Sequence, residues 1–173
     1  MSVAKAVVAT SPGQTNLSLA AKVARVVELH WIRLRSASLQ VDSFDVDQLP
    51  PELRFDISHR NSYRLRPDIG ALDVVVEYRV DILNDVSGAS REALVEAEYQ
   101  LRYLTPKDFE SQAHELKWFA ELNGTLNSWP YWREMAQTVL ARAGLGSLTL
   151  PLWRPTPIRV DETGVPVGDD SPK

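Results

Sequence analysis

Two stretches decide the fold: residues 72–83, LDVVVEYRVDIL, and residues 93–103, ALVEAEYQLRY. In both, every second side chain is apolar or aromatic and the side chains between are mostly polar or charged. This period of two predicts β-strands with one buried face. The loop NDVSGA (84–89) has turn-forming residues, so the two strands are predicted to form an antiparallel hairpin with one solvated face. The side chains predicted to face the core are Leu72, Val74, Val76, Tyr78, Val80, Ile82, Ala93, Val95, Ala97, Tyr99, Leu101 and Tyr103.

Two more strands are predicted before this hairpin. The apolar spacing between Leu29 and Val41 is close to two, with an irregularity near Trp31 and Ile32. Leu53, Phe55 and Ile57 then alternate with Arg54, Asp56 and Ser58. Residues 45–51, DVDQLPP, separate the two strands, because prolines cannot continue a hydrogen-bonded ladder. Four strands in succession predict an antiparallel meander.

Helical periods flank the predicted sheet. Asn16 is a candidate N-cap for a helix through about Val27. After the last strand, Thr105 is a candidate N-cap for a helix that runs to Leu122 and ends at Gly124. A further helix is predicted from Ser128 to Ala143, with Pro130 in its first turn and Tyr131, Met135 and Val139 on its apolar side. The predicted fold class is therefore α+β, with the C-terminal helices packed on one face of the sheet.

The remaining segments divide the chain. Residues 1–14 are expected to form a flexible leader, residues 15–153 a single domain, and residues 154–173 a disordered tail rich in proline and acidic residues. Residues 1–10 contain no apolar run long enough for a signal-peptide core, and no stretch has the roughly 18 apolar residues of a membrane span. We therefore expect a cytoplasmic protein without membrane insertion.

Composition excludes several functions. The 173 residues include no cysteine, which rules out disulfides and thiolate metal sites. The formal net charge of −4 argues against a nucleic-acid partner. The three histidines, His30, His59 and His114, fall in different predicted elements, and no nucleophile elbow, P-loop or dinucleotide-binding glycine motif is present. We therefore predict no catalytic residue, no metal site, no cofactor and no enzymatic activity.

Large apolar side chains concentrate outside the strands. Two interpretations stay open: they form the core and a homo-oligomer interface, or some line a groove for flexible apolar clients. Tyr131, Met135 and Val139 are candidates for packing between helices or subunits. The candidates for the client-binding groove are Trp118, Phe119, Leu122, Trp129, Trp132 and Trp153.

Residues 126–134, LNSWPYWRE, resemble the signature that opens the main helix of the SecB chaperone family: an aromatic residue, Pro, Tyr, a variable residue, Arg and Glu. Gly144 and the segment LTLP (148–151) are similar to the family's leucine–proline segment after that helix. The resemblance covers roughly residues 29–153, and residues 126–151 are its specific part. It implies an ATP-independent holdase that binds unfolded polypeptide clients, serves protein folding and transport, and assembles as a homotetramer, a dimer of dimers.

The chain also departs from the secretion-dedicated members of that family. Leu94 and Glu96 match part of the acidic patch by which those members dock the motor SecA, which makes them candidates for a partner-docking sheet face. Arg33 and Arg35, however, stand where the first strand should carry an acidic pair, and the usual third helix is missing. The helix predicted before the first strand resembles SecB-like chaperones of toxin–antitoxin systems. The alternative function is therefore a dedicated chaperone of such a system, with an antitoxin as its partner.

Overall fold

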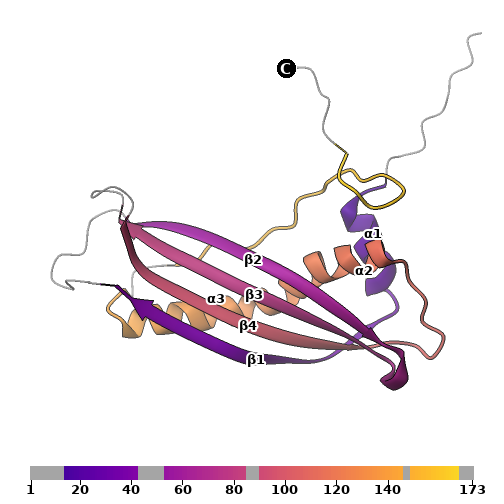
Figure 1. Cartoon of the computed structure of the whole chain (residues 1–173), viewed down its shortest axis with the longest axis horizontal. Coiled ribbons are helices and arrows are strands. Elements are labelled where there is room, and N and C mark those ends of the chain that lie inside the picture. Colours follow the sequence, from indigo (N-terminus) through magenta and orange to yellow (C-terminus); the bar gives the residue numbers. More distant parts are fainter. Residues whose placement is uncertain (1–13, 43–52, 85–89, 146–148, 168–173) are drawn as a thin grey trace, which may run out of the picture.

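The computed structural model describes residues 14–42, 53–84, 90–145 and 149–167. A four-stranded antiparallel sheet carries all of the helices on one side (Figure 1). A 3₁₀ turn (Pro67–Ile69) follows the second strand, and a π-helical turn (Ala120–Gly124) joins the last two helices. The elements are α1 (Asn16–Ala24), β1 (Glu28–Val41), β2 (Leu53–Arg66), β3 (Ala71–Asn84), β4 (Ser90–Leu104), α2 (Ala113–Phe119) and α3 (Thr125–Arg142).

The strand order is β1-β4-β3-β2, so the sheet is antiparallel as predicted but is not a simple meander. β1 pairs with β4 and not with β2. Three consecutive strands with the fourth returned beside one end make a Greek key. The prediction of a meander was wrong because alternation shows which side chains share a face, whereas the pairing partner of a strand depends on contacts between residues far apart in the chain.

The predicted core faces of β3 and β4 are confirmed: all twelve side chains predicted to face inward are buried. β1 reaches the same face only through two register shifts, between Leu29 and Trp31 and between Leu34 and Ser36. The first shift lies beside the predicted irregularity. Each shift accommodates one extra residue, so that Ile32 and Ala37 stay opposite Leu101 and Ala97 of β4.

The helix expected from Thr105 begins only at Ala113. The Thr105 amide donates to the Gly70 carbonyl (2.9 Å), which ties this segment to the β2–β3 connection instead of a first helical turn. Gln112 is the actual cap, and its backbone amide donates to the Glu115 side chain. At the other end of the chain, α1 is capped by Thr15 rather than by Asn16, and it ends at Ala24 instead of about residue 27.

Gly124 does not end a helix. The chain runs through α2, the π-helical turn and α3 without a break, so the two predicted C-terminal helices are continuous and Pro130 lies inside α3. A Cβ at Gly124 would lie 2.8 Å from Val74 Cγ1 on β3, closer than atoms can approach. Glycine is therefore required here for close packing of the helix on the sheet.

The C-terminal segment is also ordered further than predicted. Residues 153–167, named the strap below, return to α1 after α3 (Figure 1). Val160 is buried, and the Asn16 amide donates to the Ile158 carbonyl (3.0 Å). Composition suggested disorder because the strap has few apolar residues; backbone hydrogen bonds to α1 hold it instead. The predicted leader, apart from Gln14, and residues 168–173 lie outside the described residues.

Candidate functional site

The predicted groove aromatics gather in the core. Trp118, Phe119, Trp129 and Trp132 are buried together with Leu122, and Trp153 is half-buried against them. The Tyr78 ring of β3 stacks on Trp132 with their centroids 5.2 Å apart and meets the edge of Trp129 at 5.6 Å. These rings therefore join α3 to the sheet, which agrees with the core part of the first interpretation, whereas the homo-oligomer interface stays a prediction.

Hydrogen bonds also connect the start of α3 to the sheet. The Asn61 side chain of β2 donates to the Ala120 carbonyl (2.7 Å) and to Thr125 Oγ1 (3.0 Å). The Tyr78 hydroxyl lies 2.7 Å from Ser128 Oγ. Burial raises the pKa of Tyr78, so the phenol stays neutral throughout the ordinary pH range. The π-helical turn thus finds its hydrogen-bond partners in the sheet, which fixes where α3 begins.

The apolar stripe of α3 that faces the sheet differs from the predicted one by one position. Trp132, Ala136 and Leu140 are fully buried. Tyr131 is 55% exposed, and Met135 and Val139 are half-buried at the edge of the core. Both sets have a spacing of four and lie about 100° apart on the helix, so periodicity alone could not choose between them. Of the three predicted side chains, Tyr131 is the one that α3 exposes to solvent.

An apolar groove of about 220 Å³ lies between α1 and the α2–α3 junction. Leu122 and Trp153 line it, as the sequence suggested for a client groove. The contribution of α1 was missed, although its small residues at helical spacing could have indicated a shallow face. The full lining is Leu17, Ala20, Ala21, Ala24, Leu122, Asn123, Leu126, Trp153 and Pro155.

β1 presents a second apolar surface. Leu34 is 48% exposed and Leu39 is 37% exposed, although both lie opposite core residues of β4. Leu29 and Val41 on the same face are also exposed. Within the described part of the chain, no strand pairs with the outer edge of β1. An edge strand with free backbone groups and exposed leucines is a surface suited to pairing with another chain.

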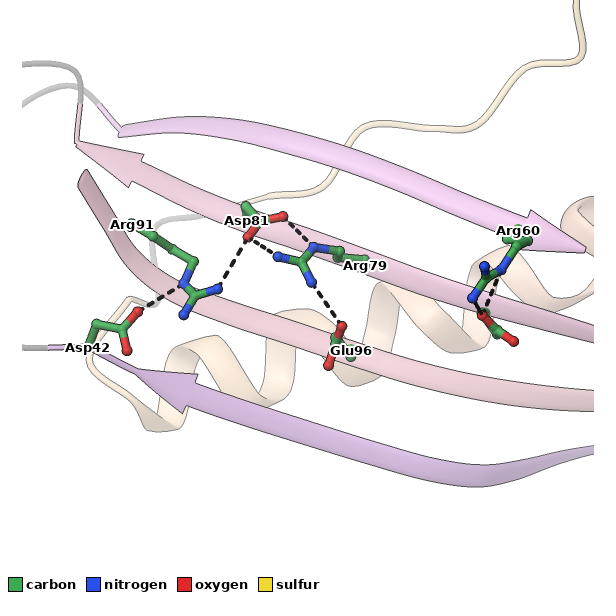
Figure 2. A network of polar contacts seen from close by, with 7 residues as sticks. Asp42, Arg60, Arg79, Asp81, Arg91 and Glu96 are labelled. Carbon is green, nitrogen blue, oxygen red and sulfur yellow. Dashed lines mark hydrogen bonds and ion pairs between the residues drawn. The ribbon is translucent and has the colours of Figure 1, made fainter. Parts of the chain in front are cut away.

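The opposite face of the sheet is covered by ion pairs (Figure 2). Arg79 lies between Asp81 (2.6 Å) and Glu96 (3.1 Å). Arg91 lies 2.9 Å from Asp42 and 4.0 Å from Asp81. Hydrogen bonds from Arg91 and Gln40 lower the pKa of Asp42. Acidic side chains of this face therefore have basic partners within the same molecule.

The two residues predicted to dock a partner, Leu94 and Glu96, lie on β4, and Glu96 is part of this network of ion pairs. Glu96 has a half-exposed carboxylate that is paired with Arg79, and Leu94 is buried. Arg35, which replaces an expected acidic residue, pairs with Glu98 at 2.6 Å, and the Arg33 guanidinium lies 4.5 Å from the centre of the Trp31 ring. This face consequently differs from an open acidic patch.

Neither metal chemistry nor a membrane span has support in the described ranges. His30 lies in β1, His59 in β2 and His114 in α2. No group of three or more histidine, cysteine or carboxylate side chains in those ranges could hold a metal ion. Among the same residues, no helix is long and apolar enough to cross a membrane.

No protein-family model matches the sequence, and no curated protein matches it at a significant level. Among solved structures, the chain is similar to the SecB-like chaperone Rv1957 of Mycobacterium tuberculosis, determined in complex with a ChAD peptide from the HigA1 antitoxin Rv1956. The TM-score is 0.70 at 21% identity, over 80% of this chain and 98% of that one. A protein of unknown function from Streptococcus agalactiae, with a TM-score of 0.42, 10% identity and coverage of 74% and 97%, is too distant to carry an argument.

The sheet with helices on one face defines an α+β fold whose β1 edge exposes apolar side chains. The likeness to Rv1957 shows that this fold is SecB-like, as the sequence analysis predicted.

Proposed function

We propose that this chain is an ATP-independent chaperone that holds non-native polypeptides on its apolar surfaces. The observation that carries the proposal is the apolar groove between α1 and the α2–α3 junction on a SecB-like fold. A holdase needs exposed apolar surface at several places, because many weak contacts together retain an unfolded chain. The groove supplies one such place on each chain, an oligomer would present several of them, and the role requires no catalytic group.

An aggregation assay tests this function. The full chain, without nucleotide, is expected to suppress light scattering by a thermally destabilised client when present in molar excess. Ala24→Lys places a charge at an exposed position in the groove and should weaken the suppression severalfold. Val26→Lys, at an exposed position outside the groove, is the matched control and should retain it. Unchanged aggregation in the presence of the wild-type chain would rule out a holdase.

A homo-oligomer formed through β1 is part of the same proposal. The free edge and the leucines exposed beside it would be covered if β1 of a second copy paired with it. Leu39→Lys is expected to shift the sedimentation of the protein toward a smaller species. Ser38→Lys, its neighbour on the opposite face, should leave the assembly intact. If both variants sediment like the wild type, subunits do not associate at this edge.

The second candidate function is a chaperone dedicated to one partner, an antitoxin. Rv1957 was determined with an antitoxin peptide, and the ion-paired outer face of this sheet offers little for docking of SecA. Affinity capture from the native cell separates the two roles: a dedicated chaperone should retain one dominant partner, and a general holdase many different chains. Measurable binding of purified SecA would instead support a role in export.

A further inference from the structure

Asn16 holds the strap through hydrogen bonds to backbone groups of the strap. The Asn16 side chain, in a residue only 1% exposed, donates from Nδ2 to the Thr156 carbonyl (3.1 Å) and accepts at Oδ1 from the Ile158 amide (2.8 Å). The Asn16 backbone amide donates to the Ile158 carbonyl (3.0 Å). A carboxamide has one donor side and one acceptor side, so it matches the carbonyl of one residue and the amide two residues later in any extended chain.

Two further hydrogen bonds also use only backbone groups of the strap. The Val160 amide donates to the Gln14 carbonyl (2.9 Å), which makes Thr15 and Arg159 an antiparallel pair without hydrogen bonds between them. The Trp118 indole donates to the Gly164 carbonyl (2.9 Å). None of these bonds uses a side chain of the strap. Apart from the position of Gly164, the surface would therefore accept a segment of different sequence.

Besides Trp153, which packs against the core, few side chains hold the strap in place. Val160 is buried, and Gly164 fits because a Cβ there would lie 2.6 Å from His114 Cβ. Ile158 and Val165, in contrast, are exposed. Beyond Trp153, the strap buries few apolar side chains, and a segment of that kind opens at a lower free energy than the core does.

The apolar groove adjoins the surface around Asn16 that hydrogen-bonds the backbone of the strap. Trp153 and Pro155 of the strap line the groove together with Leu17 of α1, directly after Asn16. A segment that replaced the strap would place its own side chains where Trp153 and Pro155 now lie, beside Leu17, and would meet the Asn16 carboxamide within a few residues. Backbone recognition combined with an adjacent apolar groove is the usual chemistry for binding an extended peptide.

We propose that the surface made by Asn16, Trp118 and the groove is a binding site for an extended, apolar client segment, and that the strap occupies it as an internal substitute. This inference rests on the proposed chaperone function and adds to it the site and a competitor. The segment that fits has an extended backbone and an aliphatic side chain two residues beyond the amide that Asn16 binds, as Val160 follows Ile158.

An engineered disulfide that reversibly ties the strap to the start of α1 provides the test. The chain has no cysteine, so a variant with Thr15→Cys and Arg159→Cys contains a single pair of thiols. Opposite residues of a non-hydrogen-bonded antiparallel pair have Cα atoms about 4.5 Å apart, within the range that a disulfide spans. The oxidised form keeps the strap in place and the reduced form releases it, so that one polypeptide serves as its own control.

The probe is a fluorescent synthetic peptide with the sequence of residues 152–160, LWRPTPIRV, and its binding is measured by anisotropy. We expect Val160→Asp, which removes the buried strap anchor, to bind the probe at least tenfold more tightly than the wild type. Adding Asn16→Ala to that variant should abolish the gain. The oxidised cysteine variant should bind at least tenfold more weakly than its reduced form.

Equal probe affinity in the oxidised and reduced forms would overturn the proposal, because the strap would then not cover the site. A disulfide formed between two chains instead of within one would also overturn it, since a second copy would be the occupant. The aggregation assay separates these results from failure of the chaperone function: a chain that suppresses aggregation equally in both redox forms is a holdase whose clients bind elsewhere.

Discussion

Gly124 and Asn61 illustrate how single residues position the long helix on the sheet. A Cβ at Gly124 would meet Val74 Cγ1 at 2.8 Å and Val76 Cγ2 at 3.3 Å. Beside it, the Asn61 side chain supplies a donor to the Ala120 carbonyl within the π-helical turn. Gly124 removes a steric obstacle and Asn61 satisfies a backbone acceptor, so the helix lies close to β3 and the Ala120 carbonyl has a donor.

Gly124→Ala should lower the free energy of unfolding, contrary to the usual effect of this substitution in a helix. Alanine ordinarily stabilises a helix interior by about 0.5–1 kcal/mol relative to glycine. Overpacking against Val74 should cost about 1–3 kcal/mol and outweigh that gain. Urea denaturation followed by tryptophan fluorescence measures the difference.

Val74→Ala in the Gly124→Ala background is the control for this mechanism. It removes the obstructing methyl groups, so the added Cβ should cost less stability there than in the wild-type background. A Gly124→Ala variant that is more stable than the wild type would show that the sheet yields and that glycine is not required for close packing.

At the scale of the element, α3 carries two apolar stripes with different tasks. Trp129, Trp132 and Ala136 are buried against the sheet. Tyr131 points outward, with Met135 half-buried beside the core. The indole of Trp129 also donates to the Pro151 carbonyl (3.2 Å), which holds the chain that follows the helix. One helix thus closes the core on one side and exposes the Tyr131 ring on another.

Truncation of adjacent aromatic residues on α3 tests this division. Trp129→Ala should lower the free energy of unfolding by about 3–5 kcal/mol, the usual cost of deleting a large buried aromatic side chain. Tyr131→Ala, at an exposed position two residues later, should change it by less than about 1 kcal/mol. Thermal and urea denaturation of both variants provide the comparison; similar losses would place both rings in the core.

At the scale of the whole molecule, the buried tyrosines link stability to pH. Burial raises the pKa of Tyr99 to about 12. Burial likewise raises the pKa of Tyr103 to about 12, against the opposing effect of a hydrogen bond from Asn127. In the unfolded chain these phenols have pKa values of about 10. The folded state therefore holds protons that the unfolded state releases between these values.

The consequence is a loss of stability at alkaline pH. Below pH of about 10 both states keep the phenols neutral, and the contribution is fully present. As the pH rises from about 10 to 12, only the unfolded state ionises, so the free energy of unfolding should fall by up to about 1.4 kcal/mol per phenol and pH unit. Urea denaturation at pH 9 and pH 11 measures the loss, which Tyr103→Phe should reduce. An equal loss in that variant would assign it to other groups.

The sequence alone determined the features that depend on local periodicity. Alternation identified every inward-facing side chain of the described hairpin strands, and residues 126–151 identified the SecB-like fold. It also drew attention to Leu122 and Trp153, which line the groove. These predictions succeeded because a strand with one buried face must repeat its apolar residues every second position, whatever it packs against.

Only the tertiary structure decided which distant segments meet. It paired β1 with β4, placed Gly124 over Val74 instead of at a helix end, and brought the strap to Asn16. It also buried most of the candidate groove aromatics and formed the groove partly from α1. Each of these outcomes depends on contacts between residues far apart in the chain, whose free energies a local pattern does not contain.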